Sequence, residues 1–205
     1  MLALLLSGGG DDLRGLAHRP SPPPKSHSKP AQPPKKHQAK PVHVRFHVVK
    51  LQTVPGRPRA KPPVVSRAAH RAARHVTHLL DRLYTLAYSR AAGHRHAPKW
   101  LLGFFAGGAQ SKARHHLEAL TIGPAGHRLA FLRPARAALW VRVLLDHHNH
   151  PFTAVASANF KARGRTGGGK KLVAQSWAKF FLQPRKHGWS ISAFEAKRRV
   201  FPVKA

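Results

Sequence analysis

The sequence between residues 66 and 92 reads SRAAHRAARHVTHLLDRLYTLAYSRAA and predicts one long helix. Apolar residues recur there at steps of three and four positions, which places them on one face of a helix. This face comprises Ala69, Ala72, Ala73, Val76, Leu80, Leu83 and Ala87. Ser66 follows two prolines and can cap the first turn, and Gly93 stands where a left-handed residue would end the helix. We therefore expect a helix over 66–92, about 40 Å long, with one buried face.

A row of basic residues follows the same predicted helix on another face. The row comprises Arg67, Arg71, Arg74, His78 and Arg82. Asp81 is the one acid in the segment, so ion pairs along the helix cannot neutralise the row. Two interpretations remain open, a solvated charged face and a surface that follows a phosphate backbone. The shortage of acids favours the second.

The charge balance of the whole chain points in the same direction. Its 205 residues include 37 Lys and Arg but only 6 Asp and Glu, a formal net charge of +31. Such a surface cannot neutralise itself, and its self-repulsion favours a polyanionic partner, of which RNA and DNA are the commonest. The basic residues are spread along the chain rather than gathered in one patch, which is typical of a protein with nucleic acid on several sides.

A ribosome provides that environment, so the composition predicts a structural constituent of a ribosome. We expect an organellar, mitochondrial ribosome, with rRNA and neighbouring ribosomal proteins as partners; cytoplasm or another organelle is the alternative location. The alternative function is a DNA-coating, chromatin-like packaging protein without sequence preference. An RNA-processing enzyme or a P-loop-like NTPase is favoured less.

Most of the 18 prolines lie before residue 64, interleaved with Lys and Arg. Proline-rich basic sequence cannot build a core and prefers extended conformations. Within this part, Val42, Val44, Phe46 and Val48 alternate with polar residues, which predicts one short strand over 42–49. We therefore divide the chain into an extended arm, 1–63, and an RNA-binding body, 64–205.

The body is expected to be mainly helical. Further helices are predicted over 98–106, 109–120, 134–147 and 172–183, and a last short one opens at 192–195, where the spacing matches a capping box. Residues 139–145 also fit a buried strand, and 152–160 predict a strand. The predicted fold class is α+β, an α-rich small globular body with a long Pro-rich basic N-terminal extension.

Residues 164–171, GRTGGGKK, match most of the P-loop pattern G-x-x-x-x-G-K-[ST]. Lys171 stands where the pattern needs a hydroxyl for magnesium, and no Asp follows at the end of a later apolar strand to complete a metal site. A flexible loop that grips RNA phosphates explains the glycines and cations equally well. The RNA-contact interpretation is preferred to the NTPase and to a plain turn.

No enzyme activity is expected, because the few acids are scattered and no His–Lys pair has a spacing typical of catalysis. The absence of cysteine excludes sulfur-ligated metal sites. Residues 146–150, DHHNH, could hold a metal, but a helix end explains them better. No cofactor, metal, small-molecule substrate or membrane association is predicted, and the short apolar N-terminus does not resemble a secretory signal.

The candidate RNA-binding residues are the clustered cations and one aromatic residue. Trp189, beside basic neighbours, is the preferred base-stacking candidate, whereas Trp140 and Trp177 are expected in the core. The full set is Lys35, Lys36, Lys40, Arg57, Arg59, Lys61, Arg67, Arg71, Arg74, Arg82, Arg163, Arg165, Lys170, Lys171, Arg185, Lys186, Trp189, Lys197, Arg198 and Arg199.

Overall fold

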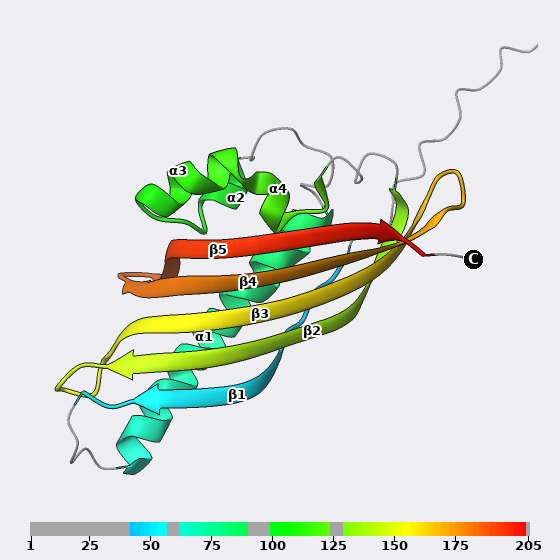
Figure 1. Cartoon of the computed structure of the whole chain (residues 1–205). Coiled ribbons are helices and arrows are strands. Elements are labelled where there is room, and N and C mark those ends of the chain that lie inside the picture. The colour runs from blue at the N-terminus through cyan, green and yellow to red at the C-terminus, as the bar shows by residue number, and fades with distance from the viewer. Residues whose placement is uncertain (1–41, 57–61, 90–98, 124–128, 204–205) are drawn as a thin grey trace, which may run out of the picture. The chain divides into compact units, whose positions relative to one another are not determined.

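The computed structural model describes residues 42–56, 62–89, 99–123 and 129–203. Its elements follow in the order β1 (His47–Val54), α1 (Pro62–Ser89), α2 (Lys99–Leu102), α3 (Gly108–His115), α4 (Leu117–Leu120), β2 (Leu129–Leu145), β3 (Pro151–Thr166), β4 (Lys171–Arg185) and β5 (Gly188–Pro202) (Figure 1). None of the described helices combines the length and apolar character needed to cross a membrane.

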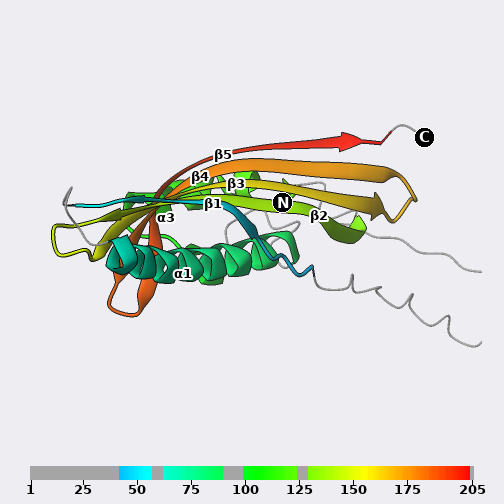
Figure 2. The same ribbon diagram turned by 90° about the horizontal axis from the view of Figure 1, so that it is seen from below.

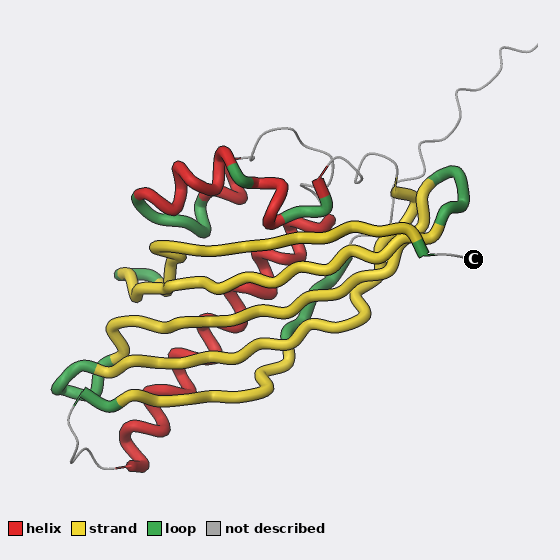
Figure 3. Tube along the Cα trace, in the orientation of Figure 1, coloured by secondary structure: helices red, strands yellow, loops and turns green. Residues whose placement is uncertain are grey.

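The five strands form one mixed sheet in the order β1-β2-β3-β4-β5 (Figure 3). Successive strands from β2 to β5 pair antiparallel, whereas β1 pairs with β2 in parallel. A parallel pair requires a crossover connection, and α1 to α4 all lie in it. About 53% of the ordered part is strand and about 28% is helix, so the prediction of an α-rich, mainly helical body is wrong.

The long strands are explained by a period of two in burial. On β3 the buried positions are Ala154, Ala156, Ala158, Phe160, Ala162 and Gly164. On β4 they include Leu172, Ala174, Ser176, Ala178, Phe180 and Leu182, so the helix predicted over 172–183 is a strand. Alanine favours helices intrinsically, but on these strands its small side chain lets a helix approach the sheet.

Other predicted helices were also wrong or shorter. The helix predicted over 134–147 is wrong: residues 134–145 belong to β2, which agrees with the alternative strand over 139–145. The helix predicted to open at 192–195 is part of β5. Among the described residues 99–106, only Lys99–Leu102 is helical, as the single turn α2. The predicted helix 109–120 is divided between α3 and α4. The strand over 152–160 is confirmed within the longer β3.

Helix α1 confirms the central prediction, and all seven residues assigned to its apolar face are buried. It begins at Pro62, so the two prolines occupy its first turn, where their missing amides cost little. Gly93 lies outside the described residues. The helix crosses one face of the sheet (Figure 2), where Tyr84 and Tyr88 pack with Phe160 at ring-centroid distances of 5.4 and 4.6 Å.

The strand predicted over 42–49 has the expected alternation of buried and exposed side chains, but its hydrogen bonds to a neighbouring strand begin later, at His47. Val42, Val44 and Phe46 are buried while His43 and Arg45 are exposed, but the strand β1 begins only at His47. Over 42–46 the backbone instead binds side chains of α1: the amide of Val44 donates to Thr85 Oγ1 at 3.0 Å. Helix side chains thus take the place of a neighbouring strand.

Candidate nucleic-acid interface

The face of the sheet opposite α1 carries cations from all five strands. No described helix crosses β2, β3 or β4 on this side, and α3 and α4 lie along the β5 edge (Figures 1 and 2). We call it the open face. Its cations, assigned by strand register, are Lys50, Arg133, Arg136, Arg142, Lys161, Arg163, Arg165, Lys171, Lys179, Lys197 and Arg199. Glu195 is the one acid that the described strands place there.

Several of these cations stand directly opposite one another on neighbouring strands. Arg133 pairs with Arg163 and Arg136 with Lys161 across β2 and β3, and Arg165 pairs with Lys171 across β3 and β4. Directly opposed like charges destabilise a sheet by a few tenths of a kcal/mol to about 1 kcal/mol per pair. We call these six residues the basic patch. Within the described chain, no ion pair relieves the repulsion, because the one ion pair found there joins His150 to Asp146.

Aromatic rings share the open face with the cations. Trp177 is 37% exposed on β4, and Trp140 is half-buried on β2. The prediction that these two tryptophans belong to the core is therefore wrong. They alternate with buried neighbours, Leu139 and Val141 on β2 and Ser176 and Ala178 on β4, so their side chains point away from α1.

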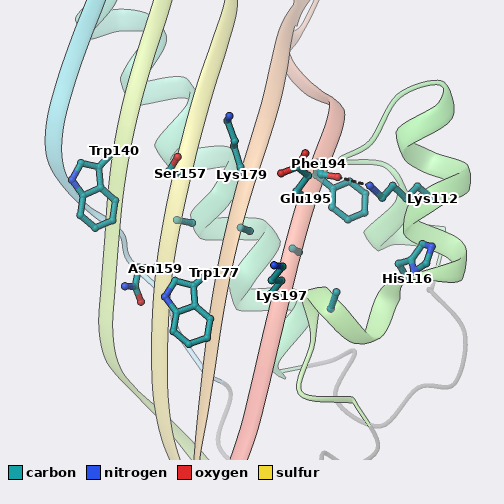
Figure 4. A pocket seen from close by; sticks show the side chains of 14 residues that line it. Lys112, His116, Trp140, Ser157, Asn159, Trp177, Lys179, Phe194, Glu195 and Lys197 are labelled. Atoms are coloured by element: carbon teal, nitrogen blue, oxygen red, sulfur yellow. Dashed lines mark hydrogen bonds between the residues drawn. The ribbon is translucent and has the colours of Figure 1, made fainter.

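A groove of about 580 Å³ lies on the open face between β2 and the helices beside β5. Its lining includes Trp140, Asn159, Trp177 and Lys179 from the sheet and Lys112 from α3 (Figure 4). The Lys112 ammonium donates to the backbone carbonyl oxygen of Phe194 at 2.8 Å and lies 5.2 Å from the centroid of the Phe194 ring. These two contacts attach α3 to β5.

A second hollow, of about 490 Å³, continues from the first toward β1. It shares Trp140 and Lys179 with the groove and adds Lys50, Arg142 and Phe181. The Lys179 ammonium lies 5.3 Å from the centroid of the Phe181 ring. Cations and aromatic rings from β1, β2 and β4 thus line one continuous hollow.

The basic row predicted on α1 lies on the other side of the molecule's sheet. Arg67, Arg71, Arg74 and Arg82 are all exposed. The Arg82 guanidinium also lies 5.9 Å from the centroid of Phe104, close to α2. Exposed cations therefore lie on both sides of the layered body. Figure 2 shows α1 on one side of the sheet.

The segment 164–171 is the end of β3, a tight turn and the first residue of β4. The amide of Lys170 donates to Thr166 Oγ1 at 3.2 Å, and Gly169 adopts a positive φ of 80°. Gly164 is needed for packing, because a Cβ there would stand 2.9 Å from the carbonyl oxygen of Phe131. A P-loop joins a strand to a helix, whereas this turn joins two antiparallel strands.

The candidate residues near the C-terminus divide between the two faces. Lys197 and Arg199 lie on the open face, but Arg198 points to the opposite side, where it donates to the carbonyl oxygen of Thr121 at 3.5 Å. Arg185 and Lys186 are exposed at the β4–β5 hairpin. The predicted base-stacking residue Trp189 is half-buried and lines a hollow of about 490 Å³ on the α1 side.

Six predicted cations lie outside the described residues: Lys35, Lys36, Lys40, Arg57, Arg59 and Lys61. Conversely, sequence reasoning missed the open face as a unit. The available signal was alternation, since Lys161, Arg163 and Arg165 occupy every second position, as do Gln175, Trp177 and Lys179. That period of two marks side chains that share one face of a strand.

The histidine cluster 146–150 forms the β2–β3 turn rather than a helix end. Asp146 accepts hydrogen bonds from the amides of His150 and His148 at 2.8 and 2.9 Å, and these bonds hold the pKa of its carboxyl below the ordinary range. No three His, Cys, Asp or Glu side chains of the described segments are placed to hold one metal ion.

The chain matches no protein-family model, and comparisons with curated proteins and with solved structures return no match.

Proposed function

We propose that this protein binds RNA as a structural constituent of a ribosome, with rRNA and neighbouring ribosomal proteins as its partners. The observation that supports the proposal most strongly is the basic patch, in which three pairs of cations oppose each other across β2, β3 and β4. A phosphate backbone converts that repulsion into attraction, because each phosphate can lie between two cations.

The position of the basic surfaces favours a large RNA assembly over a single bound duplex. Cations lie on the open face and, on the α1 side, at Arg67, Arg71 and Arg74. A protein that contacts one duplex usually concentrates its charge on one side. A component packed among several rRNA segments needs contacts on more than one side, and an organellar, mitochondrial ribosome is the assembly we propose.

The alternative, a protein that coats DNA without sequence preference, is supported by the same charge. The exposed Trp177 favours RNA, because unpaired bases that can stack on aromatic side chains are much commoner in folded RNA than in duplex DNA. The proposed role involves no catalysis.

Crosslinking in cells followed by sequencing of the bound nucleic acid tests the proposal directly. We expect rRNA of one ribosomal subunit, and we expect the protein to sediment with that subunit in a lysate gradient. Recovery of DNA with no preferred sequence, or sedimentation free of ribosomal subunits, would overturn the ribosomal assignment.

A further inference from the structure

We propose that the groove on the open face holds unpaired nucleotides, whose bases stack on Trp177 and Trp140. This inference rests on the proposed RNA-binding function and specifies the form of the RNA, a single-stranded segment rather than a duplex.

The two indole rings are far enough apart for one base to stack on each of them. Trp177 pairs directly with Asn159 on β3. Trp140 lies two residues along β2 from Ala138, the residue opposite Asn159, and therefore on the same face. Their strands are separated by β3, so the two backbones stand about 10 Å apart. Figure 4 shows Asn159 between the two rings and all three side chains on the side away from α1.

Polar groups on the floor and rim of the groove suit nucleotides better than an apolar protein segment. Asn159 Oδ1 is covered and accepts no hydrogen bond from the described residues. Lys112, Lys179 and Lys197 line the same groove, against the single acid Glu195. Cations beside aromatic rings are the combination that binds single-stranded nucleic acid, with phosphates at the cations and bases at the rings.

A duplex does not fit this combination. Its bases are stacked on each other and present only their edges, so an exposed indole gains no base face. The basic patch, farther along the same strands, can contact phosphates of either form. The stacking surface therefore distinguishes the two forms of RNA, and the patch does not.

The test compares binding of a single-stranded oligoadenylate and an RNA hairpin, by fluorescence anisotropy at one salt concentration. We expect Trp177→Ala to weaken binding of the single strand by about 5- to 100-fold and to change hairpin binding much less. Trp177→Phe should retain most of the affinity, because it keeps an aromatic face. Trp177→Leu keeps apolar bulk without that face, so it should lose affinity while circular dichroism shows a folded sheet.

Trp100 supplies the matched control. It is 42% exposed on α2 and lines the hollow on the α1 side, so Trp100→Ala should leave oligoadenylate binding unchanged. Equal losses for both RNAs, or equal affinities of Trp177→Phe and Trp177→Leu, would overturn the inference. Wild-type protein that binds only the hairpin would overturn it while sparing the proposed function, and wild-type protein that binds neither RNA would overturn both.

Discussion

The backbone amide of Phe46 donates a hydrogen bond of 2.7 Å to Oδ1 of Asp81, in the middle of α1. This bond and the one from Val44 to Thr85 attach the segment before β1 to the helix. Because the segment pairs with no strand there, these side chains supply the acceptors that its amides would otherwise lack. Asp81 thus accepts a hydrogen bond within the fold, beside its electrostatic interaction with His78 of the basic row.

The first prediction concerns the ionisation of Asp81. Burial, the largest influence, raises the pKa of its carboxyl above the ordinary value of 3.8, although the hydrogen bond from Phe46 acts in the opposite direction. The folded state therefore holds this proton more tightly than the unfolded state. Consequently, the contribution of Asp81 to the free energy of unfolding falls as the pH rises from 3.8 through the raised pKa.

Asp81→Asn should remove that pH dependence, since its amide oxygen can still accept from Phe46 and carries no charge. Denaturant unfolding of both proteins across the acidic range measures the difference. Asp81→Ala is the contrasting variant: it leaves the Phe46 amide without its acceptor and should lose about 1–3 kcal/mol at neutral pH. Equal destabilisation by Asn and Ala would contradict this account.

The second prediction is that one substitution in the basic patch changes stability and binding in opposite directions. Arg163→Gln removes one member of the pair with Arg133, so the free protein should gain a few tenths of a kcal/mol to about 1 kcal/mol in unfolding free energy. The same change should weaken RNA binding. Arg185→Gln is the control for the stability change, because Arg185 faces Gly188 and opposes no cation, so its unfolding free energy should not rise. A loss of stability in Arg163→Gln would show that the opposed cations do not repel.

The third prediction concerns the basic row on α1. If Arg67, Arg71, Arg74 and Arg82 all contact phosphates of a duplex segment, replacing the four with Gln should flatten the log–log salt dependence of RNA binding by about 3.6 units. Glutamine is a good helix former, so helix content should change little. An unchanged slope in a still-helical variant would show that this face of α1 contacts no RNA, and that the contacts lie on the open face or on the proline-rich arm.

The fourth prediction concerns the β3–β4 turn. Lys170→Ala together with Lys171→Ala should weaken RNA binding and reduce the salt slope by about two units. ATP and GTP turnover should stay at background in both the wild type and the variant, since the turn lacks the helix and the hydroxyl of a P-loop. Magnesium-dependent turnover that disappears in the variant would restore the NTPase alternative.

The fifth prediction concerns a buried group of hydroxyls. Within the described residues, the hydroxyl oxygens of Tyr84, Tyr88 and Ser176 are buried without a hydrogen bond of good geometry. Burial raises the pKa of Tyr88 to about 12. Tyr88→Phe keeps the ring packing against Phe160 and removes an unsatisfied group, so thermal unfolding should occur at the same or a higher temperature. A clear drop in the midpoint would indicate that the Tyr88 hydroxyl is hydrogen-bonded after all, to Ser176 or to an ordered water.

The sequence was informative where apolar residues lay on one face only. Helix α1 was predicted from its stripe of Ala, Val and Leu, because its opposite face is basic throughout. Strand β4 was missed because both of its faces carry apolar residues. Val173, Trp177 and Phe181 lie on the open face, and Phe180 lies on the buried face. In the sequence Trp177 stands three or four positions from each of the other three, which is the spacing of an apolar helix face.

The candidate site was missed for a related reason. Its residues come from strands that are distant in the sequence, and register alone places Arg133 opposite Arg163. Local clusters of charge, the signal used for prediction, found Arg163, Arg165, Lys171, Lys197 and Arg199 individually. Isolated cations such as Lys50, Arg142 and Lys179 became visible as part of one surface only through the strand pairing.

The parallel pairing of β1 with β2 has a consequence for the order of folding. Strands β2 to β5 can form from successive hairpins, each closing a short loop. His47, in contrast, must find Ala138 across the whole crossover, so its ladder carries the largest loop-closure cost in the sheet. We expect β1 to join the sheet last and to open first, with amide hydrogen exchange faster at Leu51 than at Ala156. The same amide protection in β1 and β3 would show that the edge strand folds together with the hairpins. During its own synthesis, which runs from the N-terminus, the chain would then expose β1 well before β2, the strand that pairs with it, has been synthesised.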